Sequence, residues 1–252
     1  MDVFNDYAKF YDLLYQDKNY KAECDFLEKV FSKFSTRRIK SILDLGCGTG
    51  SHSLPLAKKR FHLTGVDQSK TMINQAKEKA LKENIRIEFF KKDIRTINLN
   101  TKFDAIILMF AVFSYQTKNA DAQSVFRTIK NHLNPGGIFF FDCWFGPAVL
   151  NQKPTERTKK INLGSEEIIR TAKPILDLMN NTVTVNYSVF KKKANRTLNV
   201  IKEIHIMRYF FPLEIYFFAN SFGIKILKIC PFMSLKRKLS FNDWNMAVIG
   251  TV

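Results

Sequence analysis

A glycine-rich segment preceded by a carboxylate is the part of the sequence best suited to binding chemistry. It reads Gly46-Cys47-Gly48-Thr49-Gly50, with Asp44 two residues before the first glycine. Glycines let the backbone turn tightly and approach a ligand closely. Asp44 would repel a pyrophosphate and attract a cationic amino group. The segment therefore argues against a dinucleotide and favours a nucleotide that carries an amino acid.

Two further carboxylates stand at the ends of later apolar runs. Asp67 lies twenty-one residues after Gly46, where an acidic side chain can accept hydrogen bonds from both ribose hydroxyls. Asp93 follows the next run and could accept a hydrogen bond from an adenine amino group. A single such acid is more often a helix cap or a turn residue. Three at successive strand ends predict a nucleotide site.

An alternation of apolar strands and amphipathic helices positions these residues. Strands are predicted at 39–45, 61–66, 85–90, 103–110 and 138–141, with helices at 52–60, 69–83 and 120–133 between them. Such an alternation forms right-handed βαβ units on a parallel sheet. A helix at 212–221 and a hairpin of 224–229 with 244–252 would complete seven strands. The predicted fold class is α/β with a Rossmann-like sheet.

The character of the sequence changes after about residue 150. Runs such as Thr182 to Val189 alternate with period two, which indicates antiparallel strands and predicts a β cap inserted after the fifth strand. Four parts are therefore predicted along the chain. They are an N-terminal helical cover (1–36), an α/β core (37–150), the cap (151–211), and a last helix with a hairpin that returns to the core sheet (212–252).

Taken together, these motifs resemble the class I S-adenosylmethionine-dependent methyltransferases over residues 39–142. The resemblance implies a seven-stranded sheet of that type, S-adenosylmethionine as the cofactor, and an adenine held between Met72 and Ile94. Aromatic residues near the sulfonium would add cation–π contacts. The cofactor residues expected on these grounds are Tyr11, Tyr20, Asp44, Gly46, Cys47, Gly48, Asp67, Gln68, Met72, Asp93, Ile94 and Met109.

The segments that flank the glycine loop are similar to those of small-molecule methyltransferases, notably N-methyltransferases of nucleotide-linked amino sugars. The similar segments are 7–15, 109–115 and 142–147. We therefore expect in-line transfer of a methyl group to an amino or hydroxyl group of a nucleotide-linked sugar. In related sugar N-methyltransferases a histidine lies near the position of Tyr115, so the tyrosine leaves nitrogen, oxygen and carbon open as the methylated atom.

Three residues are candidates for the chemistry at the acceptor: Tyr115, Asp142 and His205. Asp142 ends a strand at the carboxyl edge, where ligands of open α/β sheets bind. His205 alternates out of a cap strand whose apolar residues face the other way. It could be a base or hydrogen-bond donor for the acceptor, or else a surface or packing residue. An amine acceptor can lose its proton to water, whereas a hydroxyl acceptor needs a base.

The charge of the chain keeps other functions open. Lys and Arg number 40 against 23 Asp and Glu, a net charge of +17, of which +10 falls in residues 151–252. A nucleotide sugar or RNA would suit such a surface. RNA methylation with the basic cap is therefore an alternative. A catalytically silent S-adenosylmethionine-binding protein is another, because the cofactor motifs alone do not show transfer.

Location and assembly are less marked in the sequence. The four cysteines lie far apart without metal-ligand spacing, so we expect reduced thiols, no metal site and a cytoplasmic protein. No apolar run approaches the length of a membrane span. The aromatic N-terminal segment could pack across a two-fold axis, which makes a homodimer an expectation.

Overall fold

The computed structural model describes residues 7–193 and 196–252. Residues 1–6 of the predicted cover and 194–195 of the predicted cap lie outside the described residues.

The core sheet has the strand order β3-β2-β1-β4-β5-β11-β10. Its strands are β1 (Ser41–Leu45), β2 (His62–Asp67), β3 (Glu88–Lys91), β4 (Phe103–Leu108), β5 (Leu133–Phe145), β10 (Lys225–Pro231) and β11 (Asn245–Thr251). The first five are parallel, and β11 is antiparallel to both β5 and β10. The predicted α/β fold class is therefore confirmed.

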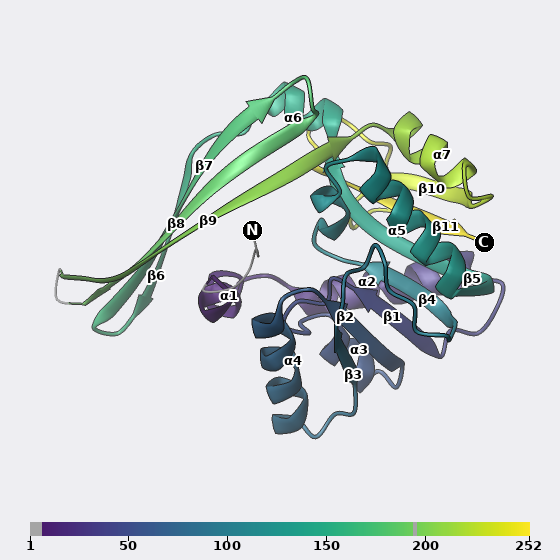
Figure 1. The fold of residues 1–252 in the computed structure, drawn as a ribbon, viewed down its shortest axis with the longest axis horizontal. Helices are drawn as coiled ribbons and strands as arrows, with labels where there is room; N and C mark the ends of the chain where they lie inside the picture. The colour runs from purple at the N-terminus through teal and green to yellow at the C-terminus, as the bar shows by residue number, and fades with distance from the viewer. Residues whose placement is uncertain (1–6, 194–195) are drawn as a thin grey trace.

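Helices cover both faces of the core sheet (Figure 1). Side chains of α5 (Asn119–His132) and α7 (Pro212–Asn220) pack with Phe139 and Phe141 on one face. Side chains of α2 (Tyr20–Phe34) and α3 (Ser53–Lys58) pack with Phe140 on the other. Neighbouring residues of β5 point to opposite faces, as strand geometry requires. Burial of each phenylalanine side chain stabilises the folded state by roughly 1.5–3 kcal/mol. Because β5 contributes to the apolar clusters on both faces, it is the centre of the core.

The sheet edge that bears the site is fixed by local signals. Helix α4 (Lys70–Lys82) begins after Ser69, whose hydroxyl accepts a hydrogen bond from the Met72 amide at 3.2 Å. Such a cap satisfies one of the free amides at a helix start and stabilises the helix by about 1 kcal/mol. The short helix η1 (Val112–Tyr115) follows β4 after Phe110 and Ala111, which both have positive φ. These turns place two new segments at the carboxyl ends of β2 and β4.

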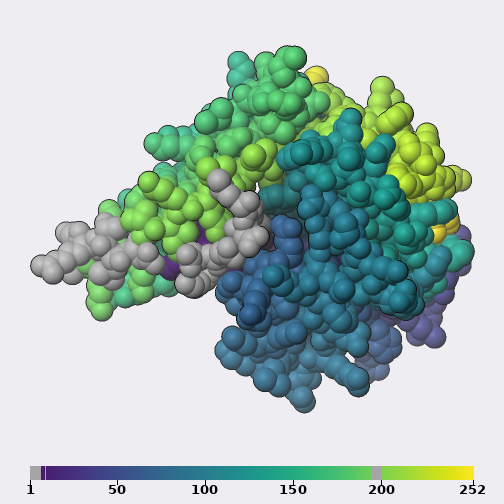
Figure 2. All heavy atoms as spheres, viewed as in Figure 1, coloured from purple at the N-terminus to yellow at the C-terminus, as the bar shows by residue number. Residues whose placement is uncertain are grey.

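The cap is an antiparallel meander that projects from the core as a long arm (Figures 1 and 2). Its strands are β6 (Arg157–Leu163), β7 (Glu166–Asp177), β8 (Thr182–Lys193) and β9 (Arg196–Phe210), preceded by helix α6 (Gly146–Gln152). The end of β9 pairs in parallel with β5 at Trp144↔Tyr209 and Phe145↔Phe210. The cap is thus continuous with the core sheet, which no periodicity in the sequence indicates.

The N-terminal helices pack in different places. Helix α1 (Ala8–Leu14) lies against the cap, where Leu14 joins a cluster with Ile161, Ile168 and Val189. Helix α2 instead packs on the core sheet. The chain between them therefore crosses from the cap to the core. In the described part of the chain, no helix is both long and apolar enough to traverse a lipid bilayer.

Candidate active site

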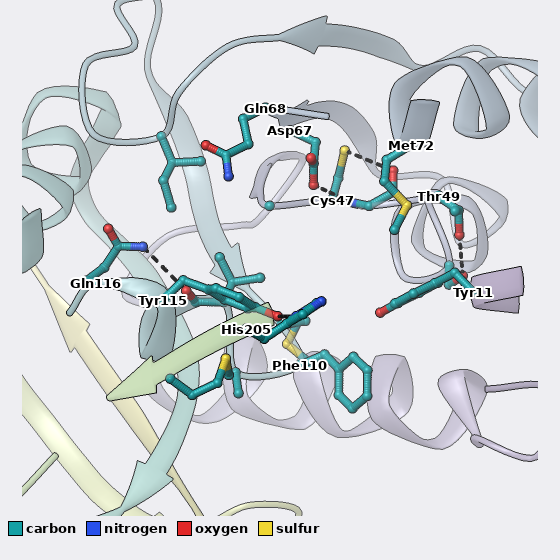
Figure 3. Close-up of a pocket in the computed structure, with 18 of the residues that line it drawn as sticks. Tyr11, Cys47, Thr49, Asp67, Gln68, Met72, Phe110, Tyr115, Gln116 and His205 are labelled. Carbon is teal, nitrogen blue, oxygen red and sulfur yellow. Dashed lines mark hydrogen bonds between the residues drawn. The ribbon is translucent and has the colours of Figure 1, made fainter. Parts of the chain in front are cut away.

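A cavity of about 690 Å³ lies at the carboxyl ends of the parallel strands, between the core and the cap. Drug-sized ligands occupy pockets of about 300–1,000 Å³. Figure 3 shows Asp67, Gln68 and Met72 on one side of the cavity and Tyr115 with His205 on another. The side with Asp67 is called here the core wall, and the side with Tyr115 and His205, to which the cap contributes, is called the cap wall.

The glycine loop forms part of the core wall in the conformation that its composition allows. Gly46, Gly48 and Gly50 have φ values of +79°, +54° and +78°, which favour glycine. A Cβ atom on Gly46 would lie 2.5 Å from a methyl carbon of Val112. The amides of Gly46 and Cys47 both donate to the Val66 carbonyl, at 2.7 and 3.0 Å. The loop is thus folded back onto the end of β2.

Asp67 stands where the sequence predicted a ribose-binding carboxylate. Its Oδ2 accepts from the Gly48 amide at 2.9 Å and its Oδ1 from the Ser69 amide at 2.8 Å. Burial raises the pKa of Asp67 above its ordinary value, against these hydrogen bonds. A carboxylate offers about four lone-pair sites, so sites remain for two hydroxyls. The geometry fits a bound ribose.

Asp93 and Ile94 also line the cavity, beside an arginine that no motif marks. Arg95 Nε lies 3.0 Å from both oxygens of Asp93, and Arg95 Nη2 lies 2.6 Å from Oδ2. The Arg95 guanidinium holds the pKa of Asp93 below its ordinary value. An adenine amino group that donates to Asp93 would share the carboxylate oxygens with the Arg95 guanidinium.

Asp44 lies behind the core wall and not on it. Its side chain is buried, and its Oδ2 accepts a hydrogen bond from the Ser53 hydroxyl at 2.6 Å. Burial raises the pKa of Asp44 to about 6. Direct contact between this carboxylate and a cationic ligand group was expected from the sequence. The structure corrects that expectation, because β1 directs the side chain toward the start of α3.

Tyr11 and Tyr20, which the sequence predicts near the sulfonium, both line the cavity. The Tyr20 ring packs edge-on against His52, with the ring centroids 5.0 Å apart. His52 Nε2 lies 2.6 Å from Glu23 Oε2, and the other Glu23 oxygen binds Lys18. This chain of polar contacts is not apparent in the sequence, because its members come from α2, the preceding turn and the end of the glycine loop.

Tyr115 and His205, which are 90 positions apart in the sequence, meet at the cap wall (Figure 3). The Tyr115 hydroxyl lies 2.7 Å from His205 Nδ1, and His205 Nε2 lies 3.1 Å from Glu203 Oε2. His205 is 3% exposed. It also lines the cavity, so it is not a surface residue. Glu203, the third member of this chain, is two positions from His205 on the same strand, and its part in the site depends on β9 turning that face inward.

Asp142 does not line the cavity, contrary to its expected direct contact with the acceptor. Its Oδ2 accepts from the Ala111 amide and from Asn245 Nδ2, both at 2.9 Å. Burial raises the pKa of Asp142 to about 6. Asn245, which no motif marks, does line the cavity, and its Oδ1 has no hydrogen-bond partner among the described residues. Asp142 therefore reaches the cavity through the amide that it orients.

Aromatic rings make up much of the remaining cap wall. Those that line the cavity are Tyr7, Tyr15, Phe110, Trp144 and Tyr187. Behind them, Arg170 donates to the hydroxyls of Tyr7 and Tyr15, at 3.3 and 3.0 Å. Among the described residues that line the cavity, Arg95 is the only lysine or arginine, and it lies on the core wall. The cap wall thus suits the uncharged part of a ligand.

Residues 42–137 match the protein family described as "Methyltransferase domain". This segment is similar to the members of that family. It contains the glycine loop, Asp67, Asp93 and Tyr115, whereas Glu203, His205 and Asn245 lie outside it. The segment thus contains the glycine loop, Asp67 and Asp93 of the core wall, whereas the cap wall combines residues of this segment with residues before and after it.

Two curated proteins are similar to part of the chain. The chain is 31% identical over 140 residues to a putative methyltransferase of Geobacillus sp. (strain WCH70), covering 56% of this chain and 57% of that protein. It is 30% identical over 145 residues to a dTDP-3-amino-3,4,6-trideoxy-alpha-D-glucopyranose N,N-dimethyltransferase of Streptomyces venezuelae, covering 56% and 59%. The chain therefore spans less than two thirds of the length of these relatives.

Solved structures resemble the whole chain, cap included. A S-adenosylmethionine-dependent methyltransferase from Clostridium acetobutylicum has a TM-score of 0.82 at 23% identity and covers 100% of this chain and 99% of its own. Streptomyces venezuelae DesVI has a TM-score of 0.81 at 18% identity and covers 98% of both chains. The core and its cap together have the fold of these proteins.

Proposed function

We propose that the protein transfers the methyl group of S-adenosylmethionine to an amino or hydroxyl group of a small molecule, with a nucleotide-linked sugar as the leading acceptor. The observation that carries this proposal is the cavity itself. Its core wall holds the glycine loop and Asp67, and its cap wall holds Tyr115 and His205. Similarity to a dTDP-amino-sugar N,N-dimethyltransferase supports the choice of acceptor.

The core wall would hold the cofactor, whose sulfonium supplies an electrophilic methyl group. Asp67 would accept hydrogen bonds from the ribose hydroxyls, and Met72 and Ile94 would pack on the adenine. Asp93 would accept from the adenine amino group. Tyr11 and Tyr20 would face the sulfonium, where a cation–π contact contributes about 0.5–2 kcal/mol. Asp44 would support the loop from behind through Ser53.

The cap wall would orient the acceptor and exclude water from it. Holding two reactants in line can contribute several kcal/mol to catalysis. The Tyr115 hydroxyl and Asn245 Oδ1 are polar groups on this wall that can hydrogen-bond an amino or hydroxyl group. The aromatic rings around them suit the flat apolar faces of a sugar ring. Asp142 acts here as a positioning residue, through Asn245.

A nucleotide diphosphate would extend beyond the cap wall, because Arg95 is the only lysine or arginine among the described residues that line the cavity. The surplus of basic residues after residue 150 can attract it. RNA could use the same charge. The cavity favours a small acceptor, because residues of the cap and of α1 enclose it together with residues of the core.

Label transfer tests the proposal. Methyl-labelled S-adenosylmethionine is offered with a panel of nucleotide-linked amino sugars and deoxy sugars, and separately with total RNA. We expect label on a nucleotide sugar and none on RNA. Label on RNA alone would replace the acceptor class. Cofactor binding with no transfer to any acceptor would instead favour a silent binding protein.

A further inference from the structure

The hydrogen bonds at the cap wall form a chain with a direction. Tyr115 and His205 Nδ1 are 2.7 Å apart, His205 Nε2 and Glu203 Oε2 are 3.1 Å apart, and Glu203 Oε1 accepts from the Tyr7 amide at 3.1 Å. We propose that Glu203 is a positioning residue that keeps the His205 proton on Nε2, so that His205 accepts a proton from Tyr115 as Tyr115 accepts one from the methyl acceptor. This relay rests on the proposed function.

The carboxylate sets the direction because it has no hydrogen to donate. An ionised glutamate only accepts hydrogen bonds, so His205 must carry its hydrogen on Nε2 to bond with it. The second nitrogen of a neutral imidazole is then an acceptor. Tyr115 must donate to that nitrogen, so within this chain its oxygen can act only as an acceptor toward a group in the cavity. Tyr115 lines the cavity and is therefore placed to receive a donor.

Tyr115 fits the middle of a relay better than it fits a base acting alone. Burial raises the pKa of its phenol well above the ordinary value, so it keeps its proton at neutral pH. It can accept a proton only as it passes its own to His205. Two further titratable groups near the imidazole are the phenols of Tyr7, which immediately precedes α1, and of Tyr187 on β8, at ring-centroid distances of 5.7 and 4.9 Å.

The relay is useful to an acceptor that enters with a proton to lose, such as a hydroxyl group. In that transfer the acceptor oxygen forms a bond to the methyl carbon, and the carbon–sulfur bond breaks with its electron pair left on sulfur. The acceptor proton passes to the Tyr115 oxygen, and the Tyr115 proton passes to His205 Nδ1. The imidazolium so formed is held by Glu203 and returns its proton to water after product leaves.

The tautomer of His205 can be measured without any substrate. Long-range proton–nitrogen NMR of the labelled protein separates the two ring nitrogens, and loss of signals in His205→Asn assigns them. We expect the Nε2–H form for His205. His132 is an internal reference of opposite kind, because its Nδ1 lies 2.8 Å from the Thr128 carbonyl and its Nε2 accepts from the Leu99 amide at 3.1 Å.

Glu203→Gln should reverse the His205 tautomer. One amide oxygen can still accept from Tyr7, which turns the amide NH2 toward the imidazole and makes Nε2 an acceptor. Loss of the proper tautomer is a known cause of large rate losses in hydrolases that orient histidine with a carboxylate. His132 should keep its Nδ1–H form. An Nδ1–H form of His205 in the unmodified protein, or no change in Glu203→Gln, would overturn the relay.

Kinetics provide the second readout. With a hydroxyl acceptor, Glu203→Gln and Tyr115→Phe should each lower kcat by about a hundredfold, with little change in the dissociation constant of the cofactor. Glu166→Gln is the matched control, because it removes a cap glutamate whose ion pair is with Lys191. Full kcat in Glu203→Gln would contradict the relay. If no acceptor is methylated at all, the proposed function fails while the NMR result still decides the tautomer.

Discussion

The two walls of the cavity are built from different ranges of the sequence. The core wall comes from segments close together in the chain, in which a strand, a turn and a helix start follow one another. The cap wall depends on contacts between remote segments, such as Tyr115 on η1 with His205 on β9 and Asp142 on β5 with Asn245 on β11. The core wall therefore forms with the sheet, whereas the cap wall requires the whole chain to be folded.

This difference suggests a division of labour. A wall built from backbone turns presents the same groups whatever the neighbouring side chains are, as a shared cofactor requires. A wall built from side chains on a meander can vary with the acceptor while the sheet stays the same. We therefore expect substitutions in the core wall to change cofactor affinity, and those in the cap wall to change acceptor affinity and turnover.

The largest effect is expected from Asp67→Ala. The substitution removes the carboxylate proposed to bind the ribose, and charge-assisted hydrogen bonds contribute about 1.5–3 kcal/mol each. Two of them correspond to a loss of cofactor affinity of roughly a hundredfold or more. Calorimetry with S-adenosylmethionine measures it. Asp25→Ala, which breaks an exposed ion pair with Lys59, is the control and should bind normally. Near-normal affinity in Asp67→Ala would remove the ribose assignment.

The second largest effect concerns stability and is specific to the core wall. The folded pKa of Asp44 is about 6, above its ordinary value of 3.8, so the folded state binds this proton more tightly than the unfolded state does. The carboxyl group therefore favours folding at low pH, and that contribution is lost between about pH 4 and pH 6. The shift of about two units corresponds to about 3 kcal/mol.

Asp44→Asn should abolish this pH dependence, because an amide does not titrate. The variant can keep the hydrogen bond, since the amide oxygen can still accept from Ser53. Urea unfolding at pH 4.5 and pH 7.5 gives the free energies. We expect the variant to gain stability relative to the unmodified protein on going to the higher pH. An equal difference at both pH values would mean that Asp44 ionises as freely in the folded state as in the unfolded state.

The same contrast explains what could be predicted from the sequence. The glycine loop, Asp67 and Asp93 could be located because short-range spacing determines a strand, a turn and the residue that follows. Met72 and Ile94, predicted to hold the adenine, also line the cavity. The sequence predicts the correct strand for Asp44. Strand alternation alone does not predict that its side chain points behind the loop to the Ser53 hydroxyl.

The cap wall was much harder to predict. Period-two alternation indicated the strands of the cap, yet it did not indicate that β9 would pair with β5 and carry His205 to Tyr115. Asn245 carries no local signal, because its importance comes from its position opposite Trp144 at the start of β11. Glu203 could have been found by the spacing of two between it and His205, which puts both on one face of a strand.

Asn245→Leu should produce a smaller effect, limited to the cap wall. The substitution keeps the size of the side chain and removes the amide that Asp142 orients toward the cavity. One hydrogen bond contributes about 1 kcal/mol, so the KM for the acceptor should rise by roughly five- to tenfold. The dissociation constant of the cofactor should not change. Asp142→Asn should follow the same pattern. A loss of cofactor affinity in either variant would move Asn245 to the cofactor side of the site.

The smallest effect is expected where the cap meets the N-terminal helices. Lys159 on β6 donates to the Leu14 carbonyl and to Asp17, both at 2.7 Å. An exposed ion pair of this kind contributes about 0.2–1 kcal/mol, so Lys159→Met should loosen α1 on the cap without unfolding it. Hydrogen exchange of the α1 amides should quicken by a few fold, while exchange in β1 and β4 stays the same. Because α1 packs against the cap, faster exchange in the core strands as well would show that the two walls do not form independently.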